Sequence, residues 1–161
     1  MSARAILNGE YECRIDDKGR IIFPAKLKKQ LSPLAEAKFF INRGFERCLV
    51  LYPLDEWKRI QRQLQNLNLY KKDSRKFLRY FNRGATELSL DGQNRLLLPR
   101  HLFDYAGIVK DVILCAFNDR IEIWNKATYD EMMVDEPDEF ANLAEKIMDD
   151  LNQKEFPEDV S

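Results

Sequence analysis

The sequence is poor in the residues from which metal, disulfide and catalytic sites are built. Its 161 residues include only three cysteines and one histidine. The cysteines, Cys13, Cys48 and Cys115, lie far apart in apolar, strand-like stretches, and no Cys-x-x-Cys pair occurs. This pattern argues against a zinc site and favours buried, reduced thiols. We therefore expect no metal, and we interpret His101 as a partly exposed surface residue.

Motifs that are typical of enzymes and membrane proteins are missing as well. No Gly-x-Gly-x-x-Gly follows a predicted strand, no Gly-Lys-Ser/Thr phosphate loop is present, and no nucleophile–base pair occurs locally. The longest apolar runs cover only a few residues, which is too short to span a bilayer. The N-terminus lacks the long apolar stretch of a signal peptide. We expect a cytoplasmic protein that is not an enzyme, with no catalytic residues, no cofactor and no small-molecule substrate.

Charge is distributed unevenly, although the net charge is only −1. Residues 1–83 hold 19 Lys and Arg against 9 Asp and Glu, whereas residues 84–161 hold 7 against 18. Residues 130–161 alone carry 12 acidic and 2 basic side chains. Such asymmetry is typical of a nucleic-acid-binding face beside an acidic tail. It also fits two solvated surfaces that attract neighbouring subunits head to tail, and the two interpretations are compatible.

One stretch of the sequence, residues 16–27, occurs a second time at residues 91–102. A constant offset of 75 aligns Asp16 with Asp91, Arg20 with Arg95, Pro24 with Pro99 and Leu27 with Leu102. In each copy a polar turn leads into a short apolar strand, and a proline then opens a helix. Four matched positions and a shared apolar pattern indicate a duplication.

The polar turns of the two copies contain residue types that stabilise tight turns. We assign a structural role there to Asp16, Gly19, Pro24, Asp91, Asn94 and Pro99. An aspartate at the head of a turn can accept hydrogen bonds from the backbone two residues later. Gly19 can adopt a positive φ without steric cost, and Asn94, its counterpart, tolerates the left-handed region best among the other residues.

The duplication continues downstream at an offset of 72, which aligns Leu49 with Ile121 and Leu51 with Ile123. The predicted organisation is an α+β fold with two β-rich modules, 10–55 and 84–127, joined by basic helices at 56–83 and followed by an acidic helical extension at 128–161. Two such copies are expected to bury their apolar faces against each other in one pseudo-symmetric core. Each module should begin with a hairpin, and the tip of the first is Asp17-Lys18-Gly19.

The candidate nucleic-acid contacts are basic residues at and near these tips. They are Arg14, Lys18, Arg20 and Arg95. Arginine offers a planar fork for guanine or phosphate, and a two-stranded ribbon fits the major groove of DNA. The alternative is that each arginine pairs with the aspartate across its own turn and only holds the turn closed. The most basic window, residues 71–83, is either a phosphate-binding helix or a connecting helix with a solvated basic face.

Three segments together resemble the MraZ family of bacterial transcriptional regulators. They are Gly9-Glu10-Tyr11-Glu12, Asp16-x-Lys18-Gly19-Arg20-x-x-x-Pro24 and Asp91-x-x-x-Arg95-x-x-x-Pro99. The resemblance covers roughly residues 8–133 and leaves the acidic extension after residue 135 outside it. Regulators of this family carry two tandem modules similar to the swapped-hairpin DNA-binding domains of AbrB, SpoVT and MazE-type proteins. In the second copy, Asn94 replaces the usual glycine.

The resemblance implies a function, a location and an assembly. It implies a cytoplasmic, nucleoid-associated regulator that binds short direct repeats in double-stranded DNA upstream of its own gene. That gene lies in the division and cell-wall cluster, which such proteins usually repress. The resemblance also implies a pseudo-dimeric fold, ring-shaped homo-oligomers, and DNA contacts by Lys18 and Arg20, with Arg95 matching by position. The alternative is an antitoxin-like module that binds and inhibits a partner protein through its acidic C-terminal helix.

Overall fold

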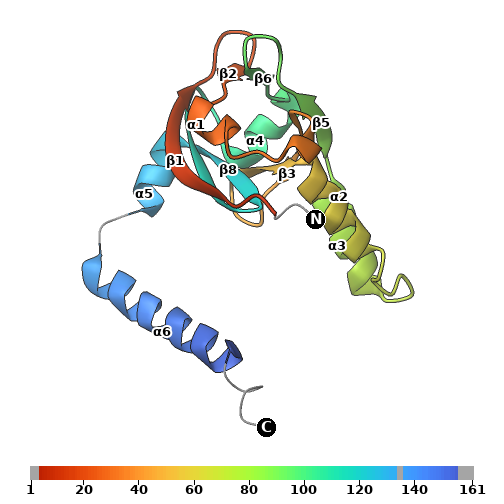
Figure 1. Ribbon diagram of the computed structural model, residues 1–161, viewed down its shortest axis with the longest axis vertical. Coiled ribbons are helices and arrows are strands. Elements are labelled where there is room, and N and C mark those ends of the chain that lie inside the picture. The colour runs from red at the N-terminus through yellow and green to blue at the C-terminus, as the bar shows by residue number, and fades with distance from the viewer. Residues whose placement is uncertain (1–3, 134–135, 156–161) are drawn as a thin grey trace. The chain divides into compact units, whose positions relative to one another are not determined.

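The computed structural model describes residues 4–133 and 136–155 (Figure 1). The first copy comprises β1 (Leu7–Arg14), β2 (Arg20–Ile22), α1 (Ala25–Lys28), the 3-10 helix η1 (Pro33–Ala35), β3 (Lys38–Arg43), β4 (Leu49–Pro53), α2 (Leu54–Leu64) and α3 (Lys72–Asn82). The second comprises β5 (Thr86–Ser89), β6 (Arg95–Leu97), the 3-10 helix η2 (Arg100–Leu102), α4 (Phe103–Ala106), β7 (Asp111–Asn118), β8 (Arg120–Asn125), α5 (Lys126–Met132) and α6 (Pro137–Glu155). The chain forms a body up to Tyr129 and a separate unit from Asp130 onward. The expected α+β class is confirmed.

Two antiparallel sheets make up the body. The larger sheet has the strand order β1-β7-β8-β4-β3-β5, and the smaller consists of β2 and β6 alone. The equivalent strands of the two copies are β1 and β5, β3 and β7, and β4 and β8. Exchanging each strand for its equivalent gives the same strand order read from the other end, so the larger sheet is symmetric in the two copies. Each copy thus contributes three equivalent strands, and each half of the sheet combines two strands of one copy with the first strand of the other.

The strand register follows the two offsets that the sequence contains. At the centre of the larger sheet Val50 pairs with Glu122, which lies 72 residues later. In the smaller sheet Ile21 pairs with Leu96, 75 residues later. The residue pairs next to each central pair are equivalent to one another: Leu49–Ile123 corresponds to Leu51–Ile121, and Arg20–Leu97 corresponds to Ile22–Arg95. Both central pairs therefore lie where an axis relating the copies would pass.

We expected the first two strands of each module to pair with each other in a hairpin, and this expectation is wrong. β1 pairs along its whole length with β7, whereas β2 pairs with β6 from the other copy. The physical reason is burial: β2 and β6 are three residues long, and a strand of that length cannot cover its own apolar side chain. Paired together, they leave Ile21 1% and Leu96 0% exposed.

The same short segment of each copy supplies the centre of the core. The buried residues of these segments are Ile21, Phe23 and Leu27 in the first copy and Leu96, Leu98 and Leu102 in the second. They are matched pairwise at the offset of 75, so one set of apolar positions is used twice. Burying each such side chain contributes about 1.5–3 kcal/mol. The two copies therefore share one core.

A second apolar cluster fixes the two long helices of the first copy on the sheet. Trp57 of α2 stacks on Phe40 of β3 with 4.7 Å between ring centroids, and on Phe81 of α3 with 5.5 Å. Tyr52 of β4 contacts both Trp57 and Phe81. Within the described residues, no helix is long and apolar enough to cross a membrane.

The three cysteines are unpaired, and the structure refines the expectation of their burial. Only Cys48 is fully buried, whereas Cys13 and Cys115 are half-buried. Burial raises the pKa of the Cys48 thiol to about 12 and that of the Cys13 thiol to about 11. Few thiolates therefore exist at neutral pH, and these thiols are poor nucleophiles.

Adjacent leucines of β6 allow a test of the shared core. Leu96 is fully buried, whereas Leu97 is 56% exposed on the other face of the same strand. Leu96→Ala should lower the free energy of unfolding by about 3 kcal/mol, because it removes packing from both copies at once. Leu97→Ala should change it by less than about 1 kcal/mol. Urea unfolding followed by circular dichroism measures both values, and equal values would contradict a core centred on Ile21 and Leu96.

Candidate nucleic-acid interface

Two polar loops project at the same end of the body, beyond the β2–β6 sheet (Figure 1). The first tip is residues 16–20, and the second tip is residues 91–95. Because β2 follows one tip and β6 follows the other, pairing of these strands holds the two tips side by side. The backbone joins them further, since Phe23 N–H donates to the Asn94 carbonyl and Leu98 N–H to the Gly19 carbonyl, both at 2.9 Å.

One aspartate closes each tip by the same set of hydrogen bonds. Asp16 Oδ1 accepts from the backbone N–H groups of Lys18 and Arg20, both at 2.9 Å. Asp16 Oδ2 accepts from Arg20 Nε at 2.8 Å. Asp91 makes the corresponding three bonds with Gln93 N, Arg95 N and Arg95 Nε, each at 2.8 Å. The two turns are therefore equivalent in their hydrogen bonding.

Backbone conformation explains the remaining turn residues. Gly19 has a φ of 89° and Asn94 a φ of 58°, so both lie in the left-handed region at matched positions. Pro24 precedes α1 with a φ of −58°, and Pro99 precedes η2 with a φ of −74°. Each tip thus leads through a three-residue strand into a short helix.

The closing bonds stabilise the charged form of each aspartate. The backbone N–H of Arg20 lowers the pKa of Asp16 to about 2, with a further contribution from the Arg20 guanidinium. The Arg95 backbone N–H and guanidinium lower the pKa of Asp91 in the same way. Both carboxylates are therefore ionised at neutral pH.

The four candidate contact residues are placed differently. Arg20 and Arg95 each use Nε to close the turn, and their side chains remain 25% and 29% exposed. Each guanidinium carries four further N–H donors. Arg14, at the end of β1, is 68% exposed and has Nε 3.8 Å from Asp111 Oδ1. The exposed Lys18 amino group makes no hydrogen bond or ion pair within the described part of the chain.

Two basic residues that the sequence did not single out support the tips from the opposite copy. Lys28 Nζ of α1 donates to Asn94 Oδ1 at 2.5 Å, which braces the second tip. Arg100 Nη2 donates to the Asp17 carbonyl at 2.7 Å, which braces the first tip. Neither contact follows from local spacing, because each one joins residues more than 60 positions apart in the sequence. Knowledge that β2 pairs with β6 would have been needed to find them.

The basic helix α3 lies away from the tips, beside α2 (Figure 1). Its Phe81 is buried, whereas Phe77 is 37% and Tyr80 58% exposed. No group of His, Cys, Asp and Glu side chains suited to a metal ion occurs among the described residues.

Comparison with known proteins identifies the doubled architecture. A family model described as "MraZ protein, putative antitoxin-like" matches the chain twice, at residues 6–80 and 81–151. The chain belongs to the MraZ family. It carries two tandem MraZ domains, which agrees with the resemblance of the repeated motif.

Curated relatives align with most of the chain. A "Transcriptional regulator MraZ" of Christiangramia forsetii is 41% identical over 143 residues, 88% of this chain and 92% of its own length. Proteins of the same name from Caldanaerobacter subterraneus and a Thermoanaerobacter species are each 43% identical, and they cover 88% and 91% of this chain and 96% and 99% of their own lengths. These relatives are named as transcriptional regulators, and the expectation that the chain is not an enzyme is confirmed.

One expectation about the extent of the family is wrong. The acidic extension after residue 135 does not lie outside the MraZ match, because the second match continues to residue 151. That match therefore includes most of α6. In the second copy α6 follows α5 as α3 follows α2 in the first.

The closing bonds predict how Asp16 titrates. Its folded-state pKa of about 2 lies below the usual value, so its ionised form stabilises the fold above about pH 4, and this contribution disappears as the pH falls towards 2. Arg20→Ala removes the guanidinium but keeps the backbone N–H, so the pKa should rise only part of the way to the usual value of about 3.9.

The measurement is an NMR titration of the side-chain carboxyl carbons. Asp91 serves as the internal control, because its pKa should remain lowered in the Arg20→Ala variant. A pKa of Asp16 that returns fully to about 3.9 would mean that the backbone bonds do not hold the carboxylate.

Proposed function

We propose that this protein is a sequence-specific DNA-binding transcriptional regulator that contacts DNA with its two tips. The observation that carries the proposal is the placement of both tips at one end of the body, each with a partly exposed arginine. The names of the relatives support the regulatory part, because each is a transcriptional regulator.

The outward face of the β2–β6 sheet suits the shape of DNA. Side chains alternate along a strand, so Arg20 and Arg95 lie on the face opposite the buried Ile21 and Leu96. A two-stranded ribbon of this kind fits the major groove, where the unused guanidinium N–H groups can donate to guanine or phosphate. Arg20 and Arg95 then both close the turn and contact DNA.

Lys18 makes the two tips unequal. At the matched position the second tip carries Gln93, so only the first tip has a lysine; because Asp17 matches Gly92, the net charge of the two tips is the same. Both side chains are exposed, and only their backbone N–H groups contribute to the turn. Lys18 would supply a phosphate contact, together with Arg14 on the adjacent strand. The first tip therefore offers a phosphate contact that the second tip lacks.

The finer features of the regulator are proposed on the resemblance of the sequence motifs. The target is a set of short direct repeats upstream of the protein's own gene, in the cluster for division and cell-wall synthesis, and the usual output is repression. The protein acts in the cytoplasm at the nucleoid, as a ring-shaped homo-oligomer. Several weak half-sites on one oligomer gain affinity from effective concentration, which compensates for a small contact surface on each subunit.

The strand exchange supports the finer proposal about the fold. Modules 10–55 and 84–127 form one pseudo-two-fold core of the swapped-hairpin kind found in AbrB and MazE-type domains. Pairing of β2 with β6, and of β1 with β7, supports this assignment. Residues 56–83 connect the modules, and residues 128–161 form the acidic extension.

Exchanging the charges of the tips tests the proposal. Lys18→Gln should weaken binding to the upstream DNA roughly 3- to 10-fold and should lower the slope of log affinity against log salt by about 1. Gln93→Lys should strengthen binding by a similar factor. Lys58→Gln, at an exposed position on α2, is the matched control and should change neither quantity.

Fluorescence anisotropy over a salt series, with scrambled DNA as reference, measures these changes. Arg20→Ala and Arg95→Ala should lose the preference for the upstream sequence while the protein remains folded. If the wild type shows no such preference, the regulator is not autoregulatory and the antitoxin-like alternative, binding to a partner protein, takes its place. If Lys58→Gln alone weakens binding, DNA contacts α2 and not the tips.

A further inference from the structure

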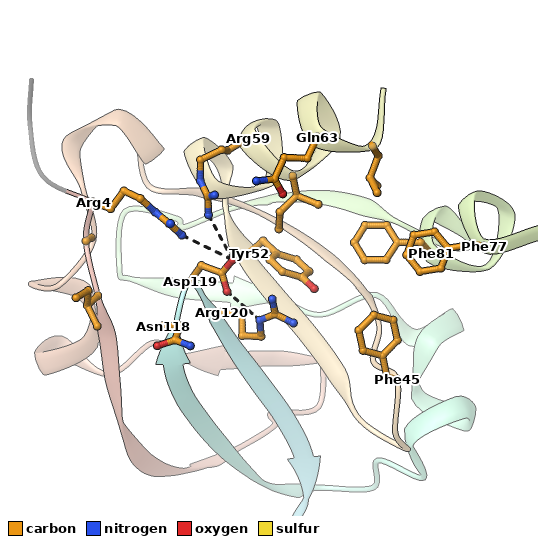
Figure 2. A pocket seen from close by; sticks show the side chains of 14 residues that line it. Arg4, Phe45, Tyr52, Arg59, Gln63, Phe77, Phe81, Asn118, Asp119 and Arg120 are labelled. Atoms are coloured by element: carbon orange, nitrogen blue, oxygen red, sulfur yellow. Dashed lines mark hydrogen bonds and ion pairs between the residues drawn. The ribbon is translucent and has the colours of Figure 1, made fainter. Parts of the chain in front are cut away.

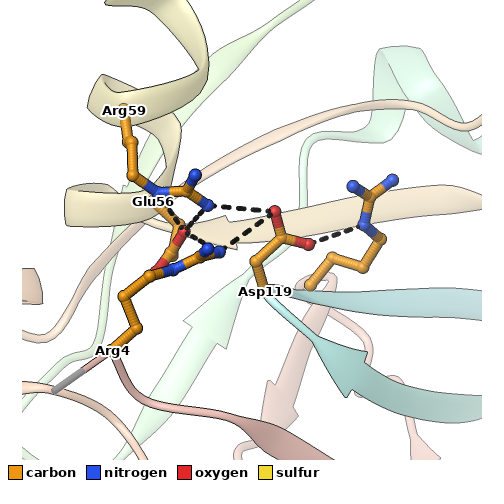
Figure 3. A network of polar contacts seen from close by, with 5 residues as sticks. Arg4, Glu56, Arg59 and Asp119 are labelled. Carbon is orange, nitrogen blue, oxygen red and sulfur yellow. Dashed lines mark hydrogen bonds and ion pairs between the residues drawn. The ribbon is translucent and has the colours of Figure 1, made fainter. Parts of the chain in front are cut away.

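Arginine side chains on the body differ in whether a carboxylate neutralises them. In the groove of about 780 Å³ shown in Figure 2, Arg4 and Arg59 gather beside Asp119. Figure 3 shows the network to which they belong, in which two nearly buried carboxylates, Glu56 and Asp119, hold these two arginines and Arg120. Each guanidinium there ion-pairs with at least one of the two carboxylates. This network therefore joins α2 to the β7–β8 turn.

Arg100, on η2, differs from these arginines because it has no carboxylate partner within the described part of the chain. Its side chain is exposed and makes a single hydrogen bond there, in which Nη2 donates to the Asp17 carbonyl at 2.7 Å. A guanidinium has five N–H donors, so four remain unused. A full positive charge thus lies on the first tip, although Arg100 belongs to the second copy.

The backbone of the first tip holds this guanidinium in place. Besides the bond to Asp17, Arg100 Nε lies only 3.6 Å from the position that a Cβ on Gly19 would occupy. The guanidinium therefore lies against the turn backbone, with no side chain between them. A side chain that is already held in position loses less conformational freedom when it binds a ligand.

Lys18 and Arg100 line the same hollow beside the first tip. It has a volume of about 540 Å³ and continues along β5, where Glu87 and Ser89 line it. Neither of the two cations is ion-paired within the described residues. Two such cations at one opening suit the backbone of a nucleic acid, which carries a negative charge on every phosphate.

We propose that Arg100 binds a phosphate of the DNA backbone beside the first tip, next to the phosphate that Lys18 contacts. The first tip is then built from both copies, because Lys18 and Arg20 come from the first and Arg100 from the second. The inference rests on the proposed DNA binding and adds to it a contact that lies outside the repeated Asp-x-x-x-Arg motif.

The duplication supplies no second copy of this contact. At the offset of 75, Arg100 matches Ala25, an exposed residue at the start of α1. Lys28, which braces the second tip, is not the counterpart of Arg100, because Lys28 matches Phe103. The position of Arg100 therefore distinguishes the first tip from the second, as the position of Lys18 does.

A phosphate contact has a signature that separates it from a brace. Phosphate contacts carry no sequence information, so losing one weakens binding to every DNA sequence alike and lowers the salt dependence of the affinity. A brace shapes the tip, so losing it should lower the preference for the upstream sequence without changing the number of counterions that DNA releases. Arg100 should show the first behaviour.

Charge-changing variants of the full chain test the proposal by fluorescence anisotropy over a salt series. Arg100→Gln should weaken binding to upstream and scrambled DNA alike, roughly 3- to 10-fold, and should lower the slope of log affinity against log salt by about 1. Arg100→Lys keeps the charge and should keep the slope. Arg62→Gln, at an exposed position on α2, is the matched control and should change neither quantity.

Two further variants extend the test to a gain of binding and to additivity. Ala25→Arg places a guanidinium at the equivalent position beside the second tip, where Gly92 matches Asp17. It should strengthen binding by a similar factor and raise the slope by about 1. Arg100→Gln combined with Lys18→Gln should lower the slope by about 2, because each residue contacts a phosphate of its own.

Three results would overturn the proposal and leave Arg100 as a brace only. They are an unchanged slope in Arg100→Gln, an Arg100→Lys variant as weak as Arg100→Gln, and an effect of Arg100→Gln that vanishes in the Lys18→Gln background. If Lys18→Gln still weakens binding in the same experiment, the proposed function stands without this contact. A wild type that does not bind DNA would overturn the proposed function and this inference together.

Discussion

Pairing of β2 with β6 is the contact on which the rest of the structure depends. Each strand has three residues and one buried side chain, so neither is stable without the other. Their pairing brings Ile21 against Leu96 and carries the following segments, with Phe23 and Leu98, into a shared core. The same pairing fixes the distance between the tips. Stability and the geometry of the candidate interface therefore have one origin.

The tips separate the residues that set shape from those that set charge. An aspartate and an arginine close each turn by equivalent bonds, so the two backbones match. The residue midway between the aspartate and the arginine is free to differ, and it is Lys18 in the first tip and Gln93 in the second. A duplicated fold can thus present two tips of the same shape with different affinity for phosphate. The braces from Lys28 and Arg100 keep this geometry when either exposed side chain changes.

The sequence was sufficient for features that are local or repeated. The Asp-x-x-x-Arg spacing indicates a closed turn because donor and acceptor lie four residues apart, and the two offsets predicted which residues of the copies correspond. Strand partners were harder, because an alternating stretch before a turn is equally compatible with a hairpin and with exchange. Lys28 and Arg100 were missed because their acceptors lie in the other copy. The place of α6 in the family was missed because this helix is acidic whereas its counterpart α3 is basic, and because the repeated Asp-x-x-x-Arg motif does not extend to it.

The central claim is that the two paired tips are the surface that meets DNA. Hydrogen exchange followed by mass spectrometry, on the full chain with and without its upstream DNA, tests this claim most directly. We predict that DNA slows exchange in peptides covering residues 14–22 and 91–97 and leaves α3 unchanged. Protection confined to α3, with both tips exchanging as in the free protein, would contradict the account and assign DNA binding to the basic helix.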